Sequence, residues 1–219
     1  MIKSLEAIVL RQTKTVGHRR MILLLSDREG VISAGTSISE SGKGKSALAI
    51  RPFTYGRFQI SSNRERLGIA GAETLKYFYG IGEDAEKLVQ AAGVMEMISK
   101  TLPEGAPARE HFCLLLRYLE LLETRKSAFG TLTAACLVKF LMMSGILPDR
   151  DNFYSDELLS NLSFDIVNVF AYLMEQPFDK MENLVLEDSK CDEILRLIKR
   201  YARVHLEIGA LKSDISLDM

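Results

Sequence analysis

The hydrophobic pattern of this chain changes its period once, near residue 80, and that change constrains the fold more than any other feature. Before residue 80, short apolar stretches alternate with polar residues, a period of two that is typical of β-strands. After about residue 83 the apolar residues recur every three or four positions, which is typical of amphipathic helices. The pattern therefore predicts two domains, a β domain over residues 1–80 and a helical domain over residues 81–219.

Five short strands are expected in the first region, at residues 5–11, 19–25, 31–34, 53–60 and 66–70. Gly30 follows a polar run and supplies the positive φ that a hairpin turn requires, and Gly56 marks a bend or bulge. No helical period falls between the strands, which disfavours a parallel α/β fold. The pattern predicts a small five-stranded closed barrel of the OB type, and so an α+β chain with an all-helical C-terminal region.

The helical region is expected to hold helices at residues 85–100, 109–124, 132–143 and 164–174, followed by a last helix that buries Ile194, Leu197, Ile198, Tyr201 and Ile208. Segment 132–143 is apolar on nearly all sides and is predicted to be the central buried helix. Gly145 and Pro148 end it, and Ser163 is the expected N-cap of the next helix. The methionines of this region are interpreted as core residues, with an adaptable apolar groove for a partner peptide as the alternative.

Several function classes are excluded by composition. With 47% hydrophobic and 26% charged residues, the chain can bury a full core. No apolar run approaches the roughly 18 residues that cross a bilayer, and the first residues do not resemble a signal peptide, so a cytoplasmic protein without a membrane partner is expected. Metal-ligand and disulfide spacings are absent among the few cysteines and histidines, which are Cys113, Cys136, Cys191, His18, His111 and His205. We therefore predict no metal, no cofactor and no enzymatic activity.

Charge is divided unevenly between the two regions. Residues 1–66 carry 12 Lys and Arg against 5 Asp and Glu, a net charge of +7. The remaining residues hold 16 basic and 24 acidic side chains, a net charge of −8. Such asymmetry indicates a nucleic-acid partner for the basic region. Attraction between the two regions of the chain is the alternative explanation.

A polar loop, residues 35–47, falls between the third and fourth strands and is expected to be exposed. Its end, Gly44-Lys45-Ser46, resembles a phosphate-binding loop, but Ser39 stands where the first glycine is required. Residues 49–53 are predicted to form a strand, and Pro52 follows closely, so the helix that such a loop needs is not expected. The loop is interpreted as a basic element that contacts phosphates.

The candidate DNA-binding residues are the basic side chains of the predicted barrel, namely Arg11, Arg19, Arg20, Lys43, Lys45, Arg51, Arg57, Arg64 and Arg66. Several are expected to share one face and to form a cationic groove for a phosphodiester backbone. A solvated basic face without a ligand is the alternative. Phe53 and Tyr55 point the same way as Arg57 by their spacing, so one of them could stack on a base, although Phe53 is more consistent with the barrel core.

Short motifs are spread along the whole chain. They are the opening strand AIVLR, the hairpin LLLSDREGVISA, the stretch KSALAIRPF from Lys45, the pair Ala72-Glu73, the helix end FLMMSGILP and the late Leu211-Lys212-Ser213. In their order and spacing these motifs resemble those of the bacterial recombination mediator family RecO. Two departures are evident. A four-cysteine zinc module that many members carry after the G-x-x-P segment is absent, and the basic loop has Ser-Glu-Ser where more Arg and Lys are expected.

The resemblance implies a protein that binds single- and double-stranded DNA, promotes strand annealing and helps load the recombinase on single-stranded DNA in DNA repair. It also implies a RecR-like partner, contact with the acidic, hydrophobic C-terminal tail of single-strand-binding protein, and a nucleoid-associated place in the cytoplasm. From the residues alone, the alternative is a non-catalytic adaptor whose OB fold binds protein and not DNA.

Overall fold

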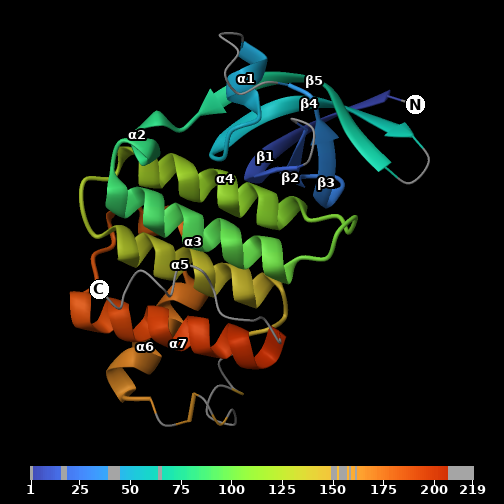
Figure 1. Ribbon diagram of the computed structural model, residues 1–219. Helices are drawn as coiled ribbons and strands as arrows, with labels where there is room; N and C mark the ends of the chain where they lie inside the picture. Colours follow the sequence, from blue (N-terminus) through green and yellow to red (C-terminus); the bar gives the residue numbers. More distant parts are fainter. Residues whose placement is uncertain are drawn as a thin grey trace.

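The computed structural model of the chain describes residues 2–15, 19–38, 45–63, 66–148, 152, 157, 159–160 and 162–206. Its N-terminal part is a closed barrel with strand order β1-β2-β3-β5-β4 (Figure 1). The strands are β1 (Ile2–Lys14), β2 (Arg20–Ser26), β3 (Gly30–Thr36), β4 (Thr54–Asn63) and β5 (Arg66–Tyr77). Helices follow from residue 79, so the predicted fold class, an OB-like barrel followed by an all-helical region, is confirmed.

The barrel is closed by one weak seam. All neighbouring strands pair antiparallel along several residues except β3 and β5, which are parallel and joined by the single pair Gly35 and Gly68. The bulge expected at Gly56 is confirmed by a register shift between Tyr55 and Gly56 against β5. Such shifts increase local bending, which a small barrel needs to close.

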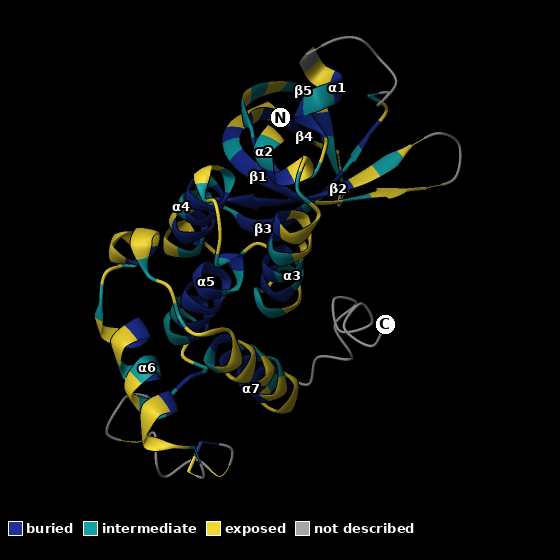
Figure 2. Ribbon diagram, turned by 90° about the vertical axis from the view of Figure 1, so that its left-hand side faces the viewer, coloured by how far each residue is buried: buried dark blue, intermediate teal, exposed yellow. Residues whose placement is uncertain are grey.

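Strand β1 is apolar on both faces because each face has a different apolar neighbour. Leu5, Ala7 and Val9 point into the barrel core, whereas Ile8 and Leu10 belong to the large apolar cluster shared with the helices. Figure 2 shows buried residues on the barrel strands and on the nearby helices, with exposed residues along α7. The barrel and the helices therefore share one continuous apolar contact.

The expected strand at residues 49–53 is wrong. Lys45–Ala49 form a short helix, α1, and Ile50 after it lies in the barrel core. The alanines and leucine of this segment favour helix, and α1 packs against β4 and β5. Phe53 then takes a positive φ of 63°, which turns the chain into β4.

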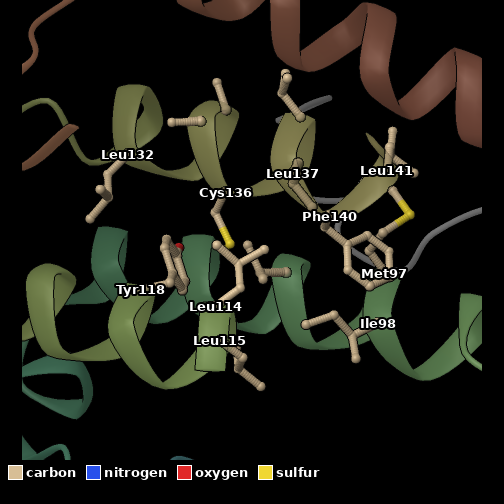
Figure 3. Packing of buried hydrophobic residues seen from close by; sticks show 14 of the residues in the cluster. Met97, Ile98, Leu114, Leu115, Tyr118, Leu132, Cys136, Leu137, Phe140 and Leu141 are labelled. Atoms are coloured by element: carbon tan, nitrogen blue, oxygen red, sulfur yellow. The ribbon is translucent and has the colours of Figure 1, made fainter. Parts of the chain in front are cut away.

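The helical region contains α2 (Tyr79–Gly82), α3 (Ala85–Thr101), α4 (Arg109–Thr124), α5 (Phe129–Met143), α6 (Phe164–Glu175), the 3-10 helix η3 (Phe178–Asn183) and α7 (Asp188–Leu206). Helix α5 packs against α3, α4, α6, α7 and η3, which confirms it as the central buried helix. Figure 3 shows Cys136 of α5 facing Tyr118 and Leu114 of α4, and Phe140 of α5 near Met97 and Ile98 of α3. The N-cap at Ser163 is confirmed, since its hydroxyl accepts from the Ile166 N–H; Ile208 lies outside the described residues.

The loop between α3 and α4 holds the helices against the β2–β3 hairpin. The Gly105 N–H donates to the Val31 carbonyl at 2.9 Å. Gly30 has a φ of 62°, and a Cβ atom on it would lie 1.8 Å from the Ala106 carbonyl oxygen. Only glycine fits this turn, which explains the sequence signal at residue 30. None of the described helices combines the length and the apolar character needed to cross a membrane.

Candidate nucleic-acid interface

A groove of about 1120 Å³ runs over one face of the barrel. Its lining comes from the described ends of the β1–β2 and β4–β5 connections, from the outer surfaces of β2 and β3, and from the α3–α4 loop. In OB folds, oligonucleotides bind at the strand 2–3 face between these two connections. The groove therefore lies where an OB fold holds its ligand.

Three of the predicted DNA-binding residues line this groove. Arg19 and Arg20 lie where the chain enters β2, and Arg66 begins β5. Arg19 and Arg66 are exposed, and among the described residues no carboxylate lies within ion-pair distance of either side chain. Within the described part of the chain, no acidic side chain competes with an anion for these two guanidinium groups.

Lys3 is a fourth groove cation that sequence reasoning missed. Its Nζ atom lies 2.7 Å from the Oε2 atom of Glu29, which also lines the groove. The sequence shows only that Lys3 is positively charged. Its position beside the β2–β3 turn could not be predicted, because that position depends on how the barrel closes. Glu29 and Glu104 are the acidic residues of the lining, and both lie near that turn.

Small residues contribute to the lining. Gly35 and Gly68, the pair that joins β3 to β5, line the groove together with Ser33 and Ser37. The Met21 side chain lies beside Gly35, since a Cβ atom on Gly35 would be 3.6 Å from the Met21 Sδ atom. Backbone amides and hydroxyls are common phosphate ligands, so these residues suit the backbone of a nucleic-acid strand.

Arg57 lies in a different setting. Its Nη2 atom is 3.0 Å from Glu6 Oε1, and its Nη1 atom is 3.6 Å from Glu73 Oε2. Both acids are its direct cross-strand neighbours, on β1 and β5. Arg57 is absent from the groove lining, so the expectation of one shared face holds for Arg19, Arg20 and Arg66 but is wrong for Arg57.

Tyr55 completes this paired cluster. Its hydroxyl donates a hydrogen bond to Glu6, and burial together with that bond raises the pKa of Tyr55 to about 12. The hydrogen bonds from Tyr55 and Arg57 lower the pKa of Glu6. The Tyr55 ring packs edge-on against Phe112 of α4 at 5.9 Å, and Phe53 is buried in the apolar cluster, so neither ring faces the groove.

The other predicted residues lie apart from the groove lining or outside the description. Arg11 is exposed on β1, and Arg51 is exposed just after α1, where its N–H donates to the Leu48 carbonyl. Lys45 opens α1, but its side chain is not described; Lys43 and Arg64 lie outside the described residues. Their contact with DNA stays a prediction.

A second concave site lies in the helical region. It has a volume of about 280 Å³ between α3, α5 and α7. Helices α3 and α7 both pack on α5 but hardly on each other, which leaves a trough along α5. Apolar Val89, Met97, Leu137 and Leu195 line it, and Arg196 and Lys199 stand at its α7 side. The sequence spacing places residues 89, 93 and 97 on one face of α3. The sequence does not show which faces of α3, α5 and α7 meet, so the trough could not be predicted from it.

The cysteines and histidines do not form a reactive centre in the described part of the chain. No group of three or more His, Cys, Asp or Glu residues described there could hold a metal ion. Cys136 is buried and Cys191 nearly so, and burial raises the pKa of both thiols, that of Cys191 to about 11. Thiols in this state are poor nucleophiles and act as small apolar side chains.

Comparison with known proteins gives a consistent set of distant relatives. No protein-family model matches the chain. A DNA repair protein RecO from Alkaliphilus metalliredigens is 24% identical over 94% of this chain and 95% of its own length. One from Caldanaerobacter subterraneus is 20% identical over 98% of this chain and 97% of its own. One from Pelotomaculum thermopropionicum is 34% identical over 53% of this chain and 46% of its own.

The near full-length relatives, among them those from Alkaliphilus metalliredigens and Caldanaerobacter subterraneus, confirm the resemblance to RecO proteins that the motifs indicated. Their shared name describes DNA repair.

Proposed function

We propose that this chain is a DNA-binding recombination mediator in DNA repair. In this proposal the barrel groove binds single- and double-stranded DNA, promotes annealing and helps load the recombinase on single strands, with a RecR-like partner, in the cytoplasm at the nucleoid. The observation that carries the proposal is the meeting of Arg19, Arg20 and Arg66 in one groove at the ligand face of an OB fold. The full-length similarity to RecO proteins supports it.

The mechanism is electrostatic. Each phosphate that an arginine neutralises releases condensed counterions, which gives affinity without sequence preference. Two strands repel each other through their phosphates, and a cationic groove lowers that repulsion while they pair. No nucleotide hydrolysis is needed, which fits a chain without a recognisable catalytic site.

The test is the double variant Arg19→Ala, Arg20→Ala in the full chain. For the wild type, the logarithm of the affinity for labelled oligo(dT) should fall linearly with the logarithm of the salt concentration, with a slope of about −0.7 per phosphate contact. The double variant should flatten this slope by roughly 1 to 1.5. Folding should be unchanged by circular dichroism, because exposed arginines contribute little stability.

A matched control removes two cations from α7 by Lys190→Ala with Arg200→Ala, which changes the net charge equally. This control should keep the wild-type slope. A groove variant that folds yet keeps wild-type affinity and slope contradicts the proposal and favours the adaptor alternative, in which the barrel binds protein.

The trough along α5 suits the second proposed partner, the C-terminal tail of single-strand-binding protein. An acidic, apolar peptide would place its side chains on Met97, Leu137 and Leu195 and its carboxylates beside Arg196 and Lys199. Calorimetry with a peptide of that tail should detect binding at sub-millimolar concentration. The variant Arg196→Ala, Lys199→Ala should weaken it by about tenfold, as expected when two charge-assisted contacts are lost.

Lys190→Ala serves as the control, because Lys190 is on α7, outside the trough, and pairs with Asp165. Equal binding by the trough variant and the wild type would place the peptide elsewhere.

A further inference from the structure

We propose that the groove holds a nucleic-acid strand by its sugar–phosphate backbone and leaves the bases facing outward, unstacked on protein and free to pair. This inference rests on the proposed function and specifies how the strand lies in the same groove. The positive charge of the groove is compatible with a strand held by its backbone and with a strand held by its bases, so other features must decide between the two.

The first observation is where the aromatic rings of the barrel lie. Residues 1–80 contain six Phe and Tyr side chains and no Trp, namely Phe53, Tyr55, Phe58, Tyr77, Phe78 and Tyr79. Phe58 is fully buried inside the barrel, and Phe53 and Phe78 belong to the cluster shared with the helices. Tyr55 packs on Phe112, and Tyr77 packs on Tyr79 at 4.5 Å. None of these six lines the groove.

The undescribed segments that adjoin groove-lining residues in the sequence contain few rings that could stack on a base. By sequence, residues 39–44 and 64–65 contain no aromatic side chain, and residues 16–18 contain only the imidazole of His18. A barrel that held bases against its surface would present rings at this face, because single-stranded DNA is usually bound by stacking successive bases on aromatic side chains. Here the rings are used for packing instead.

The second observation is what the groove does present. Its lining includes the small residues Gly35, Gly68, Ser33 and Ser37. Three of its cations, Arg19, Arg20 and Arg66, come from the two loop ends, and the fourth, Lys3, comes from β1. Glycines let a backbone approach closely, and hydroxyls, amides and guanidinium groups are donors that match phosphate oxygens. The donor set is therefore complementary to the phosphodiester. The apolar residues of the lining, which are Met21, Val31, Ile32, Leu67 and Ile69, are aliphatic and offer the bases no aromatic ring.

A strand held in this way keeps its base edges accessible to a complementary strand. Annealing then does not require the first strand to leave the protein, because the groove and the incoming bases contact opposite sides of it. A stacking groove would instead have to release each base before it could pair.

The experiment compares oligo(dT) with an abasic strand of the same length, about 16 nucleotides, made of tetrahydrofuran phosphates. The two carry equal charge, so the wild-type full chain should bind them with affinities within roughly threefold of each other. Stacking would instead weaken the abasic strand by roughly 5- to 150-fold for each base held. A loss of tenfold or more overturns the inference.

The outcomes separate this inference from the proposed function. If neither strand binds, the proposed function fails. If oligo(dT) binds well and the abasic strand does not, the function stands and the backbone-in arrangement is wrong. The variant His18→Ala should bind both strands like the wild type; a loss confined to oligo(dT) would assign stacking to His18 and overturn the inference.

A second readout is permanganate oxidation, which attacks thymines whose faces are exposed. Thymines of bound oligo(dT) should stay as reactive as those of the free strand. In the variant Arg19→Ala, Arg20→Ala the affinities for both strands should fall by the same factor, since only phosphate contacts are lost. Protection of bound thymines, or a variant that discriminates between the two strands, would show that the bases contact the protein.

Discussion

The barrel carries arginines in two settings, which differ in whether a carboxylate lies within ion-pair distance of the guanidinium group. On the groove face, Arg19 and Arg66 have no carboxylate within ion-pair distance among the described residues. On the β1–β4–β5 face, Arg57 lies between Glu6 and Glu73, with Tyr55 bound to the same Glu6. The positive charge of a residue therefore says little about its ligand until its neighbours across the sheet are known.

This difference assigns the two faces different tasks. A guanidinium that already has two carboxylate partners must lose them before it can bind phosphate, and their negative charge repels DNA. The paired face stabilises strand register, whereas the groove face is left to an external anion. Four predictions test this division, from the largest expected effect to the smallest.

The largest effect is expected at Arg66. Replacement of Arg66 by Lys, Ala and Glu should give a graded loss of affinity for oligo(dT): small for Lys, about fourfold for Ala and tenfold or more for Glu at physiological salt. This order is expected because Lys keeps the positive charge of the groove at position 66, Ala removes it and Glu reverses it. The affinities can be measured by fluorescence anisotropy. If Arg66→Glu binds like the wild type, the groove is not the DNA site and the proposed difference between the two faces is wrong.

A gain is expected when the Lys3–Glu29 ion pair is broken on the Glu29 side. Glu29→Gln removes a carboxylate from the groove and leaves Lys3 available to phosphate, so affinity should rise by about two- to threefold. Glu73→Gln removes the same charge near Arg57 and is the matched control, expected to change affinity less. Equal gains would indicate a response to net charge only.

Removal of the paired arginine should leave DNA binding nearly intact. Arg57→Ala should keep affinity within about twofold of the wild type, because Arg57 is outside the groove and its charge is already offset by Glu6 and Glu73. The same titration used for Arg66 measures it. An affinity loss as large as that of Arg66→Ala would show that the β1–β4–β5 face also contacts DNA.

The smallest effect is a pH dependence of stability. The folded-state pKa of Glu6 is lowered, chiefly by the Tyr55 hydrogen bond and then by Arg57. Its contribution to stability is therefore present above its ordinary pKa of 4.5 and is lost as the pH falls through the lowered value. Urea unfolding of wild type and Glu6→Gln should differ more at about pH 6 than at about pH 3. A difference that does not change with pH would contradict the role of Glu6.

Much of the fold could be predicted from the sequence because local patterns decide it. The amphipathic spacing predicted α4 at its observed bounds, Arg109–Thr124, and the apolar segment predicted α5 as the central helix. Strand β5 runs to Tyr77, seven residues past the predicted end, because Gly71, Ala72 and Glu73 have no clear alternation and are held by pairing with β4. That the two regions fold as separate domains stays a prediction.

The site was harder to predict, because cross-strand neighbours depend on register. Arg19, Arg20 and Arg66 could be named as loop cations next to strands. The acids that neutralise Arg57 could not, since Glu6 and Glu73 lie 51 and 16 positions away in the sequence and meet it only when the barrel closes. The helix at residues 45–49 was not predicted, because Pro52 follows closely and residues 49–53 were interpreted as a strand.

The short pairing between β3 and β5 should make the barrel open there more readily than elsewhere. Only the pair Gly35 and Gly68 joins these two strands, so opening at this position should cost the least free energy. Amide protons near Gly35 and Gly68 should therefore exchange with solvent sooner than those between β1 and β4. The same two glycines line the groove. If the groove binds DNA as proposed, a strand that spans the seam should bind the closed barrel in preference to the open one and so lower the population of the open state by mass action. Amide exchange at the seam should then be slower in the DNA complex than in the free protein.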